Sequence, residues 1–297
     1  MKFGLVLPSY GIAASKQGII EAAHLAEEFE YDSIWSTDHV LVPNQYGRTY
    51  GHIYDALTTL SFAAAVTEEV KLGTSILVLP MRNPIVVAKQ VASIDVLSGG
   101  RMILGVGVGW MEEEFSFLNA EFRQRGRYNN EGINVLRVLW TESNPSFRGK
   151  YISFHNAVFE PKPIQANGPP IWTGGNSDAA IRRAAQLGDA WHPVGLTPEQ
   201  IDSGRAKIKE LAKDRKVSLT VRMTIDIGRR RDFAYKSSSG ERRTIIGGTA
   251  AQASKMLEEY ETSGIEHMVC YFGDKPKEDI FKAARLFARE VKPSFQP

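Results

Sequence analysis

Residues 169–185, with the sequence PPIWTGGNSDAAIRRAA, form the junction on which the interpretation of the fold depends. Residues 171–173 are a short apolar run that predicts a buried strand, and the two glycines after it predict a turn. Asn176, Ser177 and Asp178 are residue types that cap helix N-termini, because their side chains accept hydrogen bonds from backbone NH groups that lack an intrahelical partner. The stretch therefore predicts a strand, a turn and a helix in immediate succession.

A turn of this kind can also bind an anion. The backbone NH groups of residues 174–177 have no partner within the helix, and the helix dipole places partial positive charge at the same point. The glycines would let a phosphate approach without meeting a Cβ atom. An ordinary capped loop has the same local pattern, so the choice between the two interpretations depends on the rest of the chain.

The whole chain repeats this alternation of strand and helix. Strands are predicted over residues 3–7, 32–36, 70–79, 102–108, 171–173, 190–193, 221–227 and 267–272. Helices are predicted over residues 16–30, 56–67, 86–97, 127–140, 178–187, 198–213, 249–263 and 277–287. Eight strands that alternate with eight helices in 297 residues predict a single (β/α)8 TIM barrel, an α/β fold that fills residues 1–297 as one domain.

Three connections are longer than such a barrel needs: residues 40–55, 141–168 and 228–248. The second contains an alternating pattern that predicts a small hairpin over the barrel. The third is basic and rich in glycine and serine, which predicts a mobile lid that includes Arg229, Arg230, Arg231, Lys236, Arg242 and Arg243. We expect the first and third at the C-terminal face of the barrel, where TIM barrels build their active sites.

Composition narrows the class of protein. The net charge is +2, which gives no reason to expect nucleic acid or an anionic membrane as a partner. The one cysteine, Cys270, lies in an apolar run, so no disulfide framework is expected. Apolar runs are too short for a signal sequence or a membrane span. We therefore expect a soluble cytoplasmic protein, and since His and Cys show no paired metal-ligand spacing, no metal site.

Three further motifs have both a functional and a structural interpretation. The sequence 104–110, LGVGVGW, lacks the spacing of a dinucleotide fingerprint, and no helix is predicted directly after it. Its glycines, Gly107 among them, indicate either a ligand flat against the strand or close packing inside the barrel. His39 follows a predicted strand and has Asp38 beside it, so it is a candidate acid or base. Residues 112–114, all glutamate, are typical of the solvated first turn of a helix, and the alternative is that one of them faces the site.

Taken in order, several motifs resemble the bacterial luciferase-like family of flavin and deazaflavin oxidoreductases, and within it the branch that uses coenzyme F420. The resemblance rests on residues 3–8, 36–39, 72–77, 97–101, 104–110, 159–163 and 170–176. It implies a (β/α)8 barrel, in agreement with the alternation above. Sugar-phosphate dehydrogenases of the family have a glutamate directly after the strand-four glycines. This chain has Trp110 there, which argues against a sugar phosphate as its substrate.

The resemblance also implies roles for individual residues. His39 is implied as the acid or base with Asp38 beside it, and the peptide between Ser75 and Ile76 matches a site where many members have a cis bond. The implied phosphate cradle is Gly174, Gly175 and Asn176, which coincides with the anion site argued above. The full set of expected cofactor contacts is Ser75, Ile76, Gly107, Thr173, Gly174, Gly175, Asn176, Ser177, Trp191 and His192.

Three functions remain open at this point. The first is hydride transfer between coenzyme F420 and a small organic substrate. The second is an FMN-dependent monooxygenase that receives reduced flavin from a partner reductase. The third is a flavin-binding protein without catalytic activity, which the intact Asp38–His39 pair argues against. A homodimer is expected by resemblance, and an F420 or flavin reductase is expected as supplier of the reduced cofactor.

Overall fold

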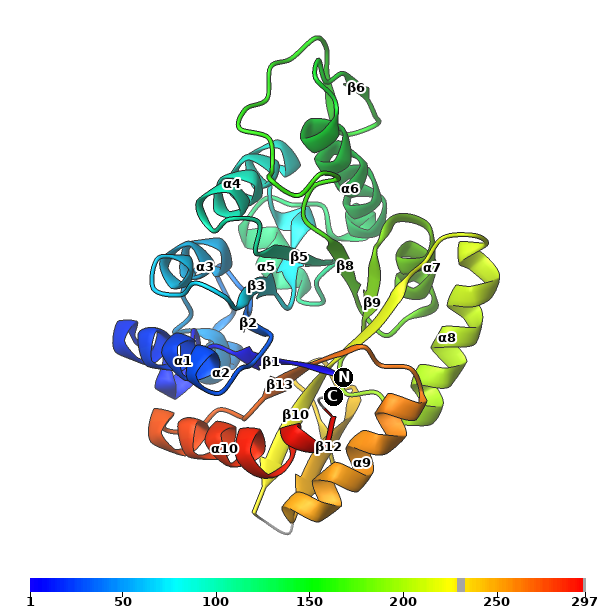
Figure 1. Cartoon of the computed structure of the whole chain (residues 1–297). Coiled ribbons are helices and arrows are strands. Elements are labelled where there is room, and N and C mark those ends of the chain that lie inside the picture. Colours follow the sequence, from blue (N-terminus) through cyan, green and yellow to red (C-terminus); the bar gives the residue numbers. More distant parts are fainter. Residues whose placement is uncertain (229–232, 296–297) are drawn as a thin grey trace.

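The computed structural model describes residues 1–228 and 233–295 and confirms the predicted barrel (Figure 1). Its strands all run parallel to their neighbours, and β9 pairs with β10 to close the ring. In order around the barrel they are β1 (Lys2–Val6), β2 (Ser33–Ser36), β3 (Lys71–Thr74), β5 (Met102–Gly107), β8 (Ile171–Gly174), β9 (Ala190–His192), β10 (Ser218–Ile227) and β13 (His267–Tyr271).

Helices surround this ring on the outside, as Figure 1 shows. They are α1 (Lys16–Glu28), α3 (Ala56–Ala64), α4 (Pro84–Leu97), α6 (Arg125–Thr141), α7 (Asp178–Leu187), α8 (Pro198–Ala212), α9 (Ala250–Thr262) and α10 (Lys277–Glu290). Polar side chains cap many of their N-termini. Thr197 and Thr249 each form a reciprocal capping box with a glutamine three residues later, which fixes the point where α8 and α9 begin.

The helix α3 ends earlier than predicted. The helix predicted over residues 56–67 ends at Ala64. The buried Arg101 guanidinium donates to the carbonyl oxygens of Ala64 at 3.1 Å and Thr67 at 2.9 Å. These hydrogen bonds satisfy carbonyl groups that the end of the helix leaves without partners, so the chain turns there into β3.

A tryptophan fills the lower part of the barrel interior. Trp35, on β2, is fully buried, and a Cβ atom at either Gly4 or Gly73 would overlap its ring. The indole NH donates to Ser33 Oγ at 2.7 Å, and that hydroxyl lies 2.8 Å from His267 Nε2. Burial lowers the pKa of His267 to about 3, so this histidine is a neutral core residue. Small residues on neighbouring strands therefore make room for one large side chain.

The third predicted strand is interrupted. The expected strand over residues 70–79 is divided into β3 and the short β4 (Leu77–Val78), which pairs with the upper end of β5. The Ser75–Ile76 peptide between them is cis, which confirms the expectation from the family resemblance. The chain bulges at this point into the barrel mouth.

The loop of residues 40–55 lies at the barrel mouth, as expected. It contains the single-turn helix α2 (Gly47–Tyr50), and residues 52–54 are hydrogen-bonded to the segment after β1. Gly11 N donates to the His52 carbonyl at 3.0 Å and Tyr54 N to the Ser9 carbonyl at 2.9 Å. The first two βα loops thus form one connected rim.

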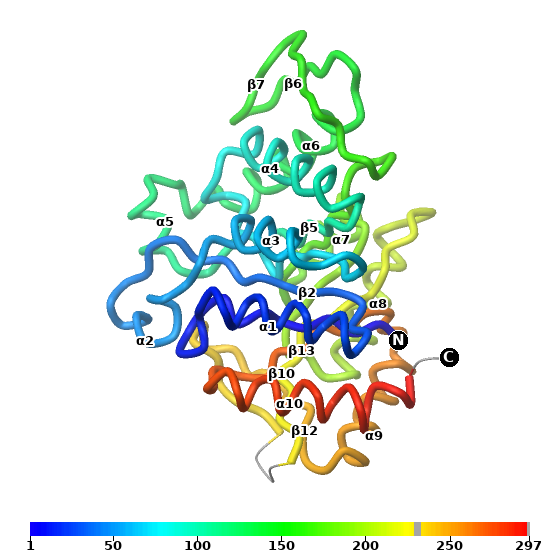
Figure 2. Tube along the Cα trace, turned by 60° about the vertical axis from the view of Figure 1, so that its left-hand side comes forward, coloured from blue at the N-terminus to red at the C-terminus, as the bar shows by residue number. Residues whose placement is uncertain are grey.

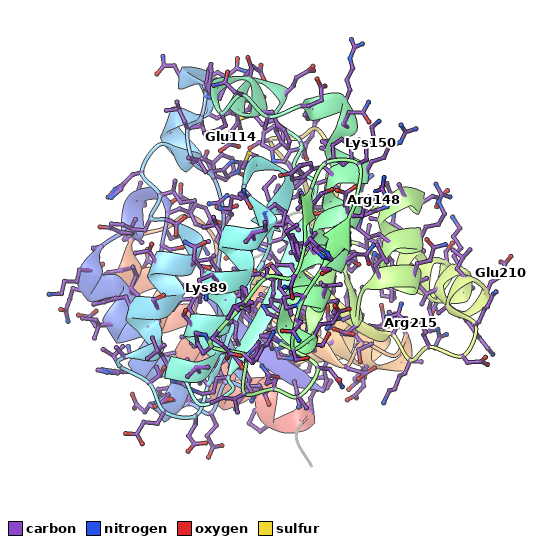
Figure 3. The ribbon with its side chains drawn as sticks, turned by 90° about the horizontal axis from the view of Figure 1, so that it is seen from above. Lys89, Glu114, Arg148, Lys150, Glu210 and Arg215 are labelled. Carbon is purple, nitrogen blue, oxygen red and sulfur yellow. The ribbon has the colours of Figure 1, made fainter. Side chains whose placement is uncertain are left out.

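The second insertion contains the predicted hairpin, but in a different place. Strands β6 (Phe147–Arg148) and β7 (Ser153–Phe154) project beyond α4 and α6 on the outside of the ring (Figures 1 and 2). Glu131 on α6 holds the turn, because its carboxylate accepts from the NH groups of Lys150, Tyr151 and Ile152 at 2.7 to 2.8 Å. The hairpin, where Figure 3 labels Arg148 and Lys150, therefore covers a helix and not the barrel mouth.

The third insertion is more regular than predicted. Residues expected in a lid form β11 (Ala234–Lys236) and β12 (Arg242–Gly248), an antiparallel pair. Strand β12 also pairs in parallel with the upper half of β10, from Thr224 to Ile227. The sheet therefore extends above the barrel here, which sequence composition could not indicate. Arg229, Arg230 and Arg231 of the expected lid lie outside the described residues.

No helix within residues 1–228 and 233–295 has the length and apolar character needed to cross a membrane.

Candidate active site

His39 follows β2 at the C-terminal face of the barrel, as predicted. Its Nδ1 lies 2.8 Å from Glu114 Oε2, and both side chains are buried. The imidazole also packs on the ring of Tyr50, with 4.3 Å between ring centroids, and meets Trp110 edge-on at 6.2 Å. The pair is therefore a buried imidazole–carboxylate contact within an aromatic wall.

Glu114 is the one of the three glutamates that faces the site, and the sequence did not indicate which of them would do so. The short helix α5 (Glu112–Phe117) begins at these glutamates, as their first-turn pattern indicated, but only Glu112 and Glu113 are exposed. Glu114 is buried, and its second oxygen accepts from Val40 N at 2.6 Å. Figure 3 labels Glu114 on this helix. One signal was available: the apolar Met111 precedes Glu114 by three residues, so both face the same side of a helix.

Asp38 is next to His39 in the sequence, but its carboxylate binds other residues and not the His39 ring. Its carboxylate binds Arg82 through two hydrogen bonds of 2.8 and 2.9 Å and accepts from Val78 N at 2.8 Å. Burial raises the pKa of Asp38, and the Arg82 guanidinium opposes that rise. The side chain therefore holds β4 and the start of the next helix against the end of β2. Adjacent residues in an extended chain point to opposite sides, which explains the separation.

A buried histidine holds the cis peptide. Ser75 Oγ lies 2.9 Å from His192 Nε2, and His192 Nδ1 lies 2.8 Å from Thr220 Oγ1. Since the Thr220 hydroxyl donates to the Trp191 carbonyl at 3.0 Å, it must accept from Nδ1–H, and Nε2 accepts from Ser75. Burial lowers the pKa of His192 to about 3, in keeping with this neutral tautomer. His192 therefore positions Ser75 from below.

Ile76 explains why Gly107 on β5 and Gly174 on β8 have no side chain. A Cβ atom at Gly107 would lie 2.5 Å from Ile76 Cδ1, and one at Gly174 would lie 2.6 Å from Ile76 Cγ2. The space beside both glycines is occupied by this side chain. Of the two interpretations left open for Gly107, close packing inside the barrel is the one that the structure supports. A ligand would lie on Ile76 and not on the strand.

The predicted cradle follows β8. Gly175 has a φ of 121°, and Ser177 caps α7 by accepting from Ala180 N at 3.3 Å. Asn176 binds the backbone of Val194 through both atoms of its amide, at 2.9 and 3.0 Å. Its side chain is therefore committed to the loop after β9. Backbone NH groups at the start of α7 remain as the donors for an anion.

Two expected cofactor contacts point away from the barrel interior. The Thr173 hydroxyl binds the Ala190 carbonyl at 3.4 Å, and a Cβ atom at Gly188 would lie 2.9 Å from its methyl carbon. Trp191 is fully buried on the outer side, where its ring fills the space beside Gly204, and its indole NH donates to the Gly175 carbonyl at 2.9 Å. Both side chains support the cradle from behind. Their predicted contact with the cofactor is corrected, because alternate residues of a strand face opposite sides.

Arg222, on β10, is a second residue of the barrel mouth that was not predicted. It donates to the carbonyl oxygen of Ser75 at 2.7 Å, to Thr37 Oγ1 at 3.1 Å and to the Tyr10 hydroxyl at 3.0 Å. The alternation of buried Val221, Met223 and Ile225 was the available signal, since it turns the residue between them toward the barrel interior.

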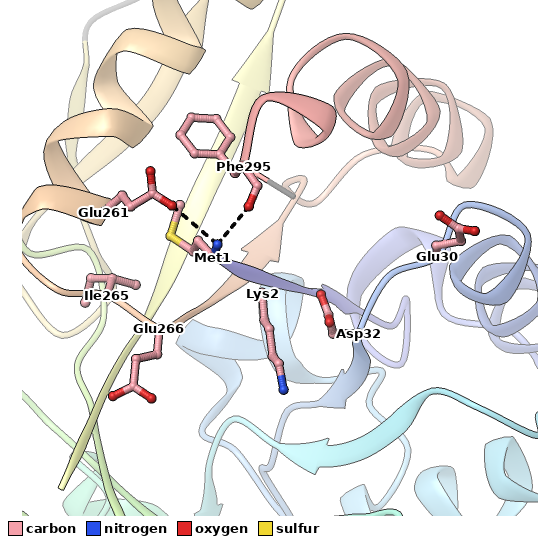
Figure 4. Close-up of a pocket in the computed structure, with 8 residues that line it drawn as sticks. All are labelled: Met1, Lys2, Glu30, Asp32, Glu261, Ile265, Glu266 and Phe295. Carbon is pink, nitrogen blue, oxygen red and sulfur yellow. Dashed lines mark hydrogen bonds and ion pairs between the residues drawn. The ribbon is translucent and has the colours of Figure 1, made fainter. Parts of the chain in front are cut away.

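A hollow of about 640 Å³ lies at the opposite end of the barrel (Figure 4). Its lining is Met1, Lys2, Glu30, Asp32, Glu261, Ile265, Glu266 and Phe295. The N-terminal ammonium group binds the Phe295 carbonyl at 2.8 Å and Glu261 at 3.4 Å. None of the candidate site residues lines it, and active sites of TIM barrels lie at the other face. Within the described chain, no group of three or more His, Cys, Asp and Glu side chains could hold a metal ion.

A sequence model described as luciferase-like monooxygenase matches residues 1–266. The chain belongs to this family. An uncharacterized protein of Mycobacterium tuberculosis is 31% identical over 208 residues, which are 66% of this chain and 71% of that protein. The family assignment makes the chain a flavin- or deazaflavin-dependent oxidoreductase.

Two other relatives have assigned activities. An F420-dependent glucose-6-phosphate dehydrogenase of Amycolatopsis mediterranei is 34% identical over 58% of this chain and 52% of its own length. An FMNH2-dependent dimethylsulfone monooxygenase of Pseudomonas putida is 35% identical over 54% of this chain and 46% of its own. This chain thus matches about half the length of each.

Solved structures share the fold. A monooxygenase from Streptomyces bottropensis has a TM-score of 0.84 at 21% identity, with both chains covered completely. The F420-dependent tetrahydromethanopterin reductase of Methanopyrus kandleri has a TM-score of 0.80 at 19% identity and 99% coverage of both chains. At these sequence identities, the structural similarity shows that the fold is shared and nothing about activity.

Proposed function

We propose that this protein transfers a hydride between coenzyme F420 and a small organic substrate. The observation that carries the proposal is the His39–Glu114 pair at the barrel mouth. Strand β2, which His39 follows, is three strands from β8, which the cradle follows. A cofactor with its phosphate on the cradle and its ring in the mouth would face His39, so the acid or base stands where the reaction would occur.

The cradle and the strands above it fit a phosphate with an acidic extension. The NH groups at the start of α7 would hold the phosphate. Thr244 N on β12 donates to the Gly195 carbonyl at 2.8 Å, next to Val194, which binds Asn176. Lys236, Arg242 and Arg243 on β11 and β12 are thus close to the cradle in the fold. Their charge would suit the acidic tail of F420, which FMN lacks.

The chain's own residues supply the proton. Because Nδ1 of His39 faces the Glu114 carboxylate, Nδ1 carries a proton and Nε2 is left for the substrate. Reduction of a carbonyl leaves an alkoxide that must gain a proton, and oxidation of an alcohol releases one. His39 Nε2 would donate in the first case and accept in the second. A bound deazaflavin supplies hydride chemistry with little activation of oxygen.

Trp110 argues against a sugar phosphate as the substrate. Its ring meets Tyr46 edge-on at 5.2 Å and His39 at 6.2 Å, so an aromatic side chain occupies this part of the wall. A hydroxyl-rich substrate would find few hydrogen-bond partners there. We therefore favour a substrate with an apolar portion beside Trp110.

An FMN-dependent monooxygenase with a partner reductase is the second candidate. It is favoured by one observation: the dimethylsulfone monooxygenase and the glucose-6-phosphate dehydrogenase are similar to this chain to nearly the same degree, 35% and 34%. In that case the same barrel mouth would hold reduced flavin supplied by the reductase, and that cofactor would supply oxygen-activating chemistry there.

A fluorescence titration with F420 and with FMN tests the choice. We expect the dissociation constant for F420 to be at least tenfold lower, about 1.4 kcal/mol of preference. Replacing Lys236 and Arg242 by Gln should weaken F420 binding severalfold and leave FMN binding unchanged. Lys209→Gln, on the exposed face of α8, is the matched control.

Tighter binding of FMN, with oxygen consumption when a flavin reductase and NADPH are added, would replace the first proposal by the second. If the protein binds a cofactor but neither converts an alcohol or carbonyl nor consumes oxygen, it is a non-catalytic flavin-binding protein.

A further inference from the structure

Arg222 is a positive charge in the barrel mouth without an anionic partner among the described residues. Its three hydrogen-bond acceptors, Ser75 O, Thr37 Oγ1 and Tyr10 Oη, are neutral oxygens. Its guanidinium carbon lies 5.1 Å from the centre of the Tyr271 ring. Burial raises the pKa of Tyr10 and of Tyr271, so both phenols stay protonated near neutral pH and do not neutralise the charge.

A purely structural role does not require this charge. Removing a cation from water costs several kcal/mol unless an anion compensates for it, and hydrogen bonds to neutral oxygens offset that cost only in part. A neutral amide could donate to Ser75 and Thr37 at a lower cost. The barrel mouth therefore has a positive potential that an arriving anion would neutralise.

The guanidinium is available to a ligand. Arginine has five NH donors, and the described contacts use three of them, so about two remain. The side chain is only partly buried, in contrast to its neighbours Val221 and Met223. A carboxylate or a similar oxyanion matches the planar arrangement of these donors.

The backbone of Arg222 is hydrogen-bonded to residues 193 and 195, beside the loop that Asn176 of the cradle binds. Its guanidinium extends away from the cradle, toward residues that follow β1, β2 and β3. Tyr10 follows β1, which is opposite β8 in the ring of eight strands, and Tyr271 ends β13 beside it. Four rings lie in succession along this wall. The distance between ring centroids is 5.9 Å from Tyr271 to Tyr10, 6.0 Å from Tyr10 to Tyr50 and 4.3 Å from Tyr50 to His39. The Arg222 guanidinium and His39 therefore border the same aromatic wall, although the backbone of Arg222 is only two strands from β8.

We propose that Arg222, Tyr10 and Tyr271 form a subsite for an oxyanion of the substrate, so that the substrate is an organic acid with an apolar or aromatic body. This inference rests on the proposed function only in placing the substrate in the same barrel mouth as His39. The arginine would anchor the acid, and the tyrosine rings would pack against its apolar part. The reacting carbon would then be held on the side of the barrel where His39 stands.

Binding of benzoate and of its neutral isostere benzamide, measured by calorimetry without any cofactor, tests the subsite. We expect benzoate to bind at least tenfold more tightly than benzamide, with an affinity that falls as salt concentration rises. Arg222→Gln should remove the preference for benzoate. Arg222→Lys keeps the charge and should retain part of the preference. Arg205→Gln, on the exposed face of α8, should leave it unchanged.

Equal affinities for benzoate and benzamide in the wild type would overturn the proposal, and so would a preference that survives in Arg222→Gln. If Arg222→Gln does not fold, the wild-type comparison together with Arg222→Lys decides. Because no cofactor is present, a failure here is distinct from a failure of F420 binding. F420 could bind as proposed while the acid subsite is rejected, or the reverse.

Discussion

Single residues at the barrel mouth carry the chemistry, and their partners are distant in sequence. His39 pairs with Glu114, 75 positions later, while its neighbour Asp38 binds Arg82. A carboxylate that accepts from both the imidazole and the Val40 NH orients the ring and also holds the loop. We therefore treat His39 as the candidate acid or base and Glu114 as its positioning residue.

His39→Ala is expected to lower kcat by about 10²- to 10⁴-fold, the usual contribution of a positioned acid or base, with little change in cofactor affinity. Glu114→Gln should lower kcat by about 10- to 100-fold. The neutral amide lacks the negative charge of the carboxylate, so it holds the proton on His39 Nδ1 less firmly. Glu113→Gln, exposed on the same helix, is the control.

Steady-state kinetics and cofactor titration measure these variants, and histidine-selective ¹⁵N NMR reports the tautomer of His39. If cofactor affinity falls as far as kcat in His39→Ala, the residue only holds the ring or the loop. An unchanged His39 spectrum in Glu114→Gln would exclude the positioning role.

At the scale of elements, glycines decide how the strands meet the cis bulge. Gly107 on β5 and Gly174 on β8 both leave room for Ile76. The same packing arrangement occurs lower in the barrel, where Gly4 and Gly73 leave room for the ring of Trp35. Glycine within a strand weakens it, so these positions indicate that a large side chain from a neighbouring strand takes the space.

Gly107→Ala should destabilise the protein by about 1 to 3 kcal/mol, since the new methyl group would overlap Ile76 Cδ1. Ile76→Val removes that carbon, so the double variant should recover part of the loss. Gly47→Ala, where the nearest atom is 3.8 Å from the new Cβ, is the control. Urea unfolding measures the wild type, the two single variants, the double variant and the control. Strictly additive effects would show that the two residues do not compete for the space.

At the scale of the whole molecule, two buried histidines link stability to pH. Burial lowers the pKa of His192 and of His267 to about 3, from the ordinary value near 6.5. The unfolded chain therefore binds protons between these values while the folded chain does not. Stability rises with pH in this window, and it is lost as the pH falls from about 6.5 toward 3.

Each of the two histidines should contribute a slope of up to about 1.4 kcal/mol per pH unit within that window. Urea unfolding at pH 7, 6 and 5 measures the slope. His267→Asn should reduce it, because the amide does not titrate and can still bind Ser33. His155→Asn, in an exposed loop, is the control. A flat profile between pH 7 and 5 would mean that the folded protein accepts these protons.

The sequence by itself determined the barrel, the cradle and the position of His39. Periodicity of two and of 3.6 residues identifies strands and helices locally, and a glycine turn before capping residues marks the start of α7 wherever the chain goes next. The cis bond at Ser75 was expected because the surrounding motif resembles known members. Each of these features depends on residues that are neighbours along the chain.

Only the tertiary structure decided which side chains meet. Arg222 reaches Tyr10 and Ser75 because β10 lies between β9 and β13 in a closed ring, with a register that turns this position inward. Trp191, one residue before His192, is turned outward by the same alternation. Contacts of this kind depend on strand register and on the paths of the loops. No local sequence pattern specifies the register or the loop path that joins residues more than 70 positions apart.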